Sequence, residues 1–130
     1  MKTIYKTSEE TGVFEVLENY VDGNWVSLVS PTAEEVKDVS QHFNIELQDM
    51  ISALDEDERA RVDTDDDYTL IIVDVPIKDK DESFDGYGTV PLAIILGDRK
   101  QKYIITISLR ELPLINDFIN GKIKKFSVNL

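Results

Sequence analysis

The sequence contains no cysteine, one histidine (His42) and no long apolar run. Without cysteine it forms no disulfide, thiolate zinc site or cysteine nucleophile, and this usage suits a reducing compartment. One histidine also excludes a multi-histidine metal site. The longest apolar run, Val90–Leu96, is far shorter than the roughly 20 residues that span a bilayer. Residues 1–10 hold no apolar stretch, so we expect no secretory signal there.

Charge of one sign dominates the composition. The 130 residues include 14 Lys and Arg against 26 Asp and Glu, a net charge of −12, which disfavours nucleic acid as a partner. Residues 1–97 carry 7 basic and 23 acidic side chains, which gives a net charge of −16. Residues 98–130 carry 7 basic and 3 acidic side chains, which gives a net charge of +4. We expect this basic part to pair with acidic surface on the same or another subunit. The length fits one domain with a real core.

Apolar periodicity and turn residues predict an α+β domain with a mixed, mostly antiparallel β-sheet and helices packed on its faces. Expected strands and helices alternate in the order β-β-β-α-α-β-β-β-β-α. Their ranges are 3–7, 13–19, 25–29, 33–42 (helix), 46–54 (helix), 61–64, 68–77, 89–96, 103–109 and 111–120 (helix). The strand centres Leu70–Val73 and Ala93–Leu96 are apolar throughout, so we expect cover on both of their faces. Residues 78–88 should form a hairpin loop.

The two central helices have local sequence signals. Thr32 and Glu35 have the spacing of a capping box, in which each side chain bonds the other residue's backbone amide. His42 should favour the C-terminus of this first helix. The second helix places four apolar residues on one stripe and Asp49 off it. The stripe consists of Leu47, Met50, Ile51 and Leu54.

Residues 55–67 hold eight carboxylates and suggest divalent cations, which prefer oxygen ligands. Two EF-hand alignments fail. The one that starts at Asp63 has Tyr68 where glycine is required, and the one that starts at Asp81 has Leu92 where the bidentate carboxylate is required. We therefore interpret both as solvated acidic loops.

Enzyme chemistry has little support in the sequence. Paired carboxylates can serve as general acid and base, but they need a cleft and shifted pKa values. Gly86-Tyr87-Gly88 lacks the third glycine and the helix of a phosphate-binding loop. Trp25 is expected as a core or edge anchor. We predict no catalytic residue; a soluble carboxylate-dependent hydrolase and an acidic protein-interaction module stay open as alternatives.

A longer arrangement is more specific. Trp25-Val26-Ser27-Leu28 is followed by Pro31-Thr32-x-x-Glu35, then by the amphipathic segment 45–51. Leu54-Asp55-x-x-Glu58-Arg59-Ala60-Arg61-Val62-Asp63 then leads into the apolar strand from Tyr68. This order resembles the amino-terminal cytoplasmic domain of the CorA family of magnesium transporters, over residues 1–126. Ala60 stands where that family usually has proline.

The resemblance implies an α/β/α sandwich in the cytoplasm, attached to the inner cell membrane only through a missing C-terminal part that residues 127–130 would begin. It implies a homo-oligomer, in the family a pentamer, whose domains bind regulatory Mg²⁺ between neighbours and so gate the transporter. By motif, the metal ligand falls on Asp49, with Gln48 where Glu is common. Asp49 also fits a solvent-facing helix residue. The transported ion, whether magnesium, cobalt or zinc, lies outside what this segment determines.

Overall fold

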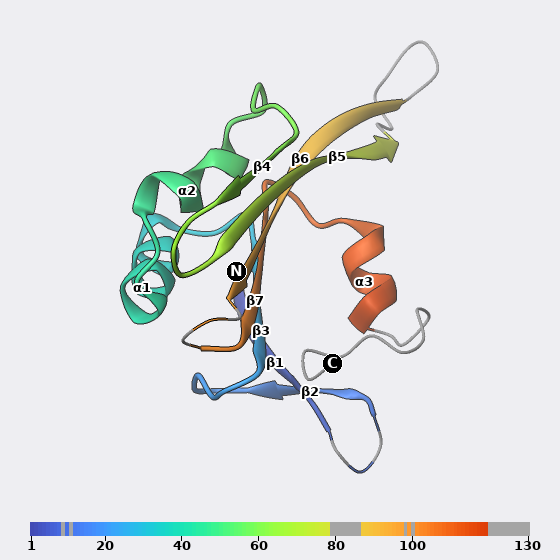
Figure 1. Ribbon diagram of the computed structural model, residues 1–130. Coiled ribbons are helices and arrows are strands. Elements are labelled where there is room, and N and C mark those ends of the chain that lie inside the picture. The colour runs from blue at the N-terminus through green and yellow to red at the C-terminus, as the bar shows by residue number, and fades with distance from the viewer. Residues whose placement is uncertain (9, 11, 79–86, 98, 100, 120–130) are drawn as a thin grey trace.

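In the computed structural model, residues 1–130 are described except for 9, 11, 79–86, 98, 100 and 120–130. Figure 1 shows one sheet with helices on both sides. The elements in chain order are β1 (Lys2–Thr7), β2 (Phe14–Leu17), β3 (Asn24–Val29), α1 (Ala33–Phe43), α2 (Leu47–Ile51), the 3₁₀ turn η1 (Ser52–Leu54), β4 (Arg61–Thr64), β5 (Thr69–Lys78), β6 (Tyr87–Gly97), β7 (Tyr103–Ser108) and α3 (Pro113–Ile119).

The sheet has seven strands in the order β2-β1-β3-β7-β6-β5-β4. Only the central pair, β3 and β7, is parallel; the other neighbours are antiparallel. The parallel register places Trp25 beside Ile104 and Leu28 beside Ile107. Residues far apart in sequence therefore meet in the middle of the sheet, and β2 and β4 form its edges.

One face of the sheet packs against α1, α2 and η1 (Figure 1). Val36, Val39 and Phe43 of α1 and Met50 of α2 lie in one buried cluster with alternate side chains of the central strands. Gly97, the last residue of β6, leaves room for the ring of Tyr103, since an added Cβ there would lie 2.2 Å from that ring. This face holds the larger core, and it fixes the position of α2.

The other face is covered by α3, whose Ile115 is buried in one cluster with Trp25 and Leu92, together with Leu112 just before the helix. The cover is incomplete: Val73 of β5 is 36% exposed, and Ile71 is half-buried. The expectation of full cover for both apolar strand centres is therefore only partly correct. The predicted α+β class, with helices on both faces, is confirmed.

Several predicted boundaries need correction. The helix predicted over 46–54 is a five-residue α-helix followed by a 3₁₀ turn, and Leu47 and Ile51 of its apolar stripe are 47% and 37% exposed. Such a short helix buries only one narrow stripe, which Met50 and Ala53 occupy. The predicted loop 78–88 is shorter, because Tyr87 and Gly88 pair with β5; residues 79–86 lie outside the described residues, as does the second EF-hand candidate from Asp81.

Other expectations agree with the structure. The seven strands and three helices follow the predicted order. Trp25 is 2% exposed and its indole Nε1 donates to Thr106 Oγ1 at 2.9 Å, so it is a core anchor. His42 lies in the last turn of α1 and stacks on Tyr20, with ring centroids 4.1 Å apart. Within the described ranges, no helix has the length and apolar character needed to cross a membrane.

Candidate functional site

The connection between α1 and α2 sets the position of the predicted ligand, Asp49. α1 ends at Phe43 because Asn44 adopts the left-handed conformation (φ 56°), and its N–H donates to the carbonyl of Ser40. The Ser40 hydroxyl in turn donates to the carbonyl of Ile45 at 2.6 Å. A new helix then begins at Glu46, whose carbonyl accepts from the N–H groups of Asp49 and Met50. The turn is thus fixed by hydrogen bonds on both sides.

Asp49 is the third helical residue after the N-cap Glu46 and is half-buried. Its Oδ2 accepts a hydrogen bond from the hydroxyl of Tyr68. The same hydroxyl accepts from the backbone N–H of Glu46 at 3.3 Å. The predicted ligand is therefore held by a side chain 19 residues away in sequence.

Tyr68 itself is almost completely buried, at 2% exposure. Its carbonyl accepts from the N–H of Asp65 at 2.9 Å, which closes the turn before β5. Burial raises the pKa of the phenol well above its usual value, and the hydrogen bond to Asp49 raises it further. The hydroxyl is consequently a neutral, fixed donor to the Asp49 carboxylate at any physiological pH.

A polar hollow of about 300 Å³ lies next to this pair, between the start of α2 and the turn before β5. A guanidinium nitrogen of Arg99 donates to the carbonyl of Asp65 at its rim. The hollow is lined by Asn44, Ile45, Glu46, Leu47, Asp65, Asp67 and Tyr68. Three carboxylates line this hollow, and Tyr68, the hydrogen-bond partner of Asp49, is one of its lining residues.

The other acidic residues of 55–67 do not converge on a site. Arg61 pairs with Glu58 and, at 2.7 Å, with Asp63. Asp55 accepts from the N–H of Asp57 at 2.9 Å in a local turn. Among the described residues, no group of three Asp, Glu or His side chains has the arrangement of a metal site. The interpretation of the segment from Asp63 as a solvated loop needs correction, because Asp63 and Asp74 lie in the paired strands β4 and β5, which is not the geometry of an EF-hand loop.

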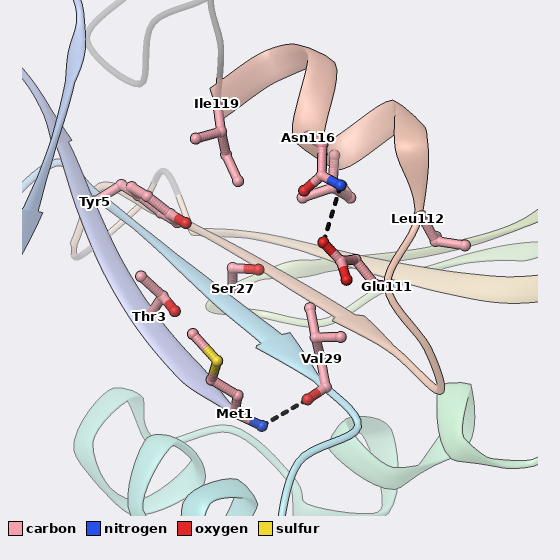
Figure 2. A pocket seen from close by; sticks show the side chains of 10 residues that line it. Met1, Thr3, Tyr5, Ser27, Val29, Glu111, Leu112, Asn116 and Ile119 are labelled. Carbon is pink, nitrogen blue, oxygen red and sulfur yellow. Dashed lines mark hydrogen bonds between the residues drawn. The ribbon is translucent and has the colours of Figure 1, made fainter.

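A second hollow, of about 180 Å³, lies between α3 and strands β1 and β3 (Figure 2). Figure 2 shows Asn116 donating to Glu111 Oε1 at 3.0 Å on one side and Thr3 and Ser27 on the strands opposite. Much of the lining is apolar, including Leu112. Glu111 is an exposed acid whose Oε1 accepts from the neutral amide of Asn116, and this contact is not that of an acid–base pair.

Sequence reasoning singled out Asp49 but missed Tyr68. The only signal was a tyrosine at the start of an apolar strand, directly after a run of acidic residues. The hydrogen bonds of Tyr68 depend on the start of β5 lying beside α2, and no spacing of residues in the sequence predicts that contact. The structure thus adds one functional candidate and leaves Asp49 with one ordered partner among the described residues.

Comparison with known proteins finds 28 matching chains of known structure, and three of them illustrate the likeness in fold. The complete CorA magnesium transporter from Methanocaldococcus jannaschii matches with a TM-score of 0.70 and 21% identity over 98% of this chain and 40% of that one. The soluble domain of the same protein matches with a TM-score of 0.73 and 21% identity, over 100% of this chain and 48% of that one. The ZntB cytoplasmic domain from Vibrio parahaemolyticus matches with a TM-score of 0.65 and 12% identity, over 92% of this chain and 48% of that one.

The chain therefore spans less than half the length of these structures. No curated protein matches it in sequence. A family model, described as CorA-like Mg²⁺ transporter protein, matches residues 21–124. This model covers most of the chain, including α1, α2 and Tyr68, and agrees with the fold. The chain belongs to the CorA-like Mg²⁺ transporter family and has the fold of the soluble domains found in it.

Proposed function

We propose that this chain is the cytoplasmic regulatory domain of a CorA-like divalent cation transporter and that it senses intracellular Mg²⁺ at the interfaces between subunits. The observation that carries the proposal is the half-buried Asp49 carboxylate, held by Tyr68 next to an acidic hollow, in a chain of this family. By this proposal, the domain comprises residues 1–126. No catalytic step is involved, and nucleic acid is no partner.

The carboxylate oxygens of this chain fit a magnesium site in which water supplies most of the ligands. Mg²⁺ prefers oxygen ligands and commonly keeps several waters, so one carboxylate from each of two subunits is enough. In this chain Asp49 would supply that carboxylate. In this proposal, water and a neighbouring subunit supply the rest of the coordination shell, since the described residues hold no group of three such ligands. Such a site binds weakly, and we expect a response in the millimolar range.

Charge explains how binding acts on the assembly. Each domain carries −12, so domains packed in a ring, five by the family resemblance, repel one another. Mg²⁺ would supply positive charge between facing carboxylates. A ligand shifts an equilibrium only by its different affinities for the two states, and this one favours the close-packed, closed state. The regulation then follows intracellular magnesium without any bond being made or broken.

The test is a magnesium titration of the full-length protein, followed by thermal unfolding. At ten times the dissociation constant, binding should stabilise the assembly by about 1.4 kcal/mol per site. The Asp49→Asn variant should lose most of this shift in Tm. Asp57→Asn, which removes the same charge from the exposed acidic turn, is the matched control and should keep it. A wild-type Tm that ignores Mg²⁺ up to about 20 mM, a concentration well above the usual range of weak extracellular and sensor sites, would refute the sensor role.

The hydrolase alternative has less support. It requires two acids that share a polar cleft and have separated pKa values. Most of the acidic side chains in 55–67 are exposed instead and pair locally. An acidic protein-interaction module would show a Tm that changes with a partner protein and ignores metal, so the same titration distinguishes it.

A further inference from the structure

We propose that Tyr68 is the positioning residue of the metal site: its hydroxyl joins the two ends of the first turn of α2 and orients the Asp49 carboxylate toward the ion. The inference rests on the proposed function, because it takes Asp49 as the ligand. The juxtaposition that carries it is the phenol oxygen of Tyr68, which lies between the N–H of Glu46 and Oδ2 of Asp49.

The arrangement at the start of α2 resembles a capping box, except that the hydroxyl of Tyr68 lies between the N-cap N–H and the carboxylate. In an ordinary capping box the side chain of the third helical residue reaches back directly to the N–H of the N-cap residue. α2 has acidic residues at both positions, but Glu46 makes no side-chain capping bond. Tyr68 instead accepts from the Glu46 N–H and donates to the Asp49 carboxylate. The start of this five-residue helix is therefore stabilised from another element of the fold.

The position of the phenol is determined by the core and not by α2. Tyr68 is 2% exposed and lies in the same buried cluster as Met50, Leu70 and Ile95. A ring packed in this way has one position, so the hydroxyl is a fixed reference point for Asp49. Asp49, by contrast, is half-buried on a single helical turn. Without the hydrogen bond its carboxylate would be free to rotate.

Orientation follows from the geometry of a carboxylate. Its two oxygens lie on opposite sides of Cγ, so a bond from Tyr68 to Oδ2 turns Oδ1 away from the phenol. Hydrogen-bond partners of metal ligands commonly hold them in this way, and their removal typically weakens metal binding by about 10- to 100-fold. A wet magnesium site, which has few protein ligands, depends strongly on each ligand being held in place.

The variant that tests this is Tyr68→Phe, which keeps the ring and removes only the hydroxyl. The matched control is Tyr103→Phe, in the same buried cluster at 4% exposure. In the full-length protein, Tyr68→Phe should raise the Mg²⁺ midpoint of the Tm shift about 10-fold, whereas Tyr103→Phe should leave it unchanged. Hydrogen exchange of the 130-residue chain without metal should show faster exchange of the Glu46 amide in Tyr68→Phe only.

The outcomes separate the two proposals. If the wild type responds to Mg²⁺, Asp49→Asn abolishes the response and Tyr68→Phe keeps the wild-type midpoint, the positioning role is wrong and the sensor role stands. If the wild type does not respond, the sensor role fails and the inference fails with it. An unchanged exchange rate of the Glu46 amide in Tyr68→Phe would also overturn the inference, because the bridge would then not exist in solution.

Discussion

The first turns of α1 and α2 each contain an acidic residue at the third helical position, and the two residues are used differently. Glu35 of α1 reaches back to the N–H of Thr32 at 3.0 Å and also accepts from the N–H of Lys2 at 2.7 Å. It pairs with the α-amino group of Met1 at 3.2 Å as well. Asp49 of α2 accepts one hydrogen bond from Tyr68 among the described residues.

The difference separates a structural carboxylate from one that is available to a ligand. Glu35 has its lone pairs occupied by backbone and terminal donors, which tie β1 to the start of α1. Asp49 has one oxygen fixed and the other directed away from its only ordered partner among the described residues. A carboxylate at the same helical position thus stabilises the fold in one case and, by our proposal, binds an ion in the other.

The largest expected effect concerns Glu35. Glu35→Ala removes the Glu35 half of the capping box at the start of α1 and the bond from its carboxylate to the N–H of Lys2 in β1, so it should lower the free energy of unfolding by about 2 kcal/mol. Glu34→Ala, at the exposed neighbouring position in the same turn, is the control and should change it by less than about 0.5 kcal/mol. Urea denaturation of both variants measures this. Equal losses would show that Glu35 is an ordinary surface acid.

Lowering the pH should reduce the stability of the fold by less than Glu35→Ala does. The pKa of Glu35 lies below its usual value, first because the N–H of Thr32 donates to the carboxylate and also because of the charged Met1 amine. A lowered native pKa means that the stabilisation is complete above the unfolded pKa of about 4.3 and is lost as the pH falls through the native pKa. Urea midpoints of the wild type and Glu35→Gln should therefore differ at pH 7 and converge toward pH 3. A constant difference would contradict this origin of the stability.

How much the sequence predicted depends on how local each signal is. The capping box of Thr32 and Glu35 follows from a three-residue spacing, and both of its hydrogen bonds are present. The left-handed conformation of Asn44, which ends α1, is an equally local effect. The strand order along the chain could also be predicted, because each strand has its own apolar pattern.

Tertiary effects account for what the sequence did not predict. Leu47 and Ile51 satisfy a helical stripe but are exposed, because α2 contacts the core through Met50 and Ala53. The bridge from Tyr68 to Asp49 depends on the packing of α2 beside the start of β5. Asp49 itself was indicated only by its place in a family motif, since an isolated Asp on a short helix has no chemistry of its own.

The central claim is that Asp49, and neither Glu35 nor the acidic turn, binds the ion. Mn²⁺ binds to the same oxygen ligands as Mg²⁺ and broadens NMR signals near its site. In the ¹⁵N spectrum of the full-length protein, in which a neighbouring subunit completes the site, low Mn²⁺ should broaden the amides of residues 46–50 first, and both excess Mg²⁺ and Asp49→Asn should prevent it. Broadening centred on residues 55–63, unchanged in Asp49→Asn, would contradict the account.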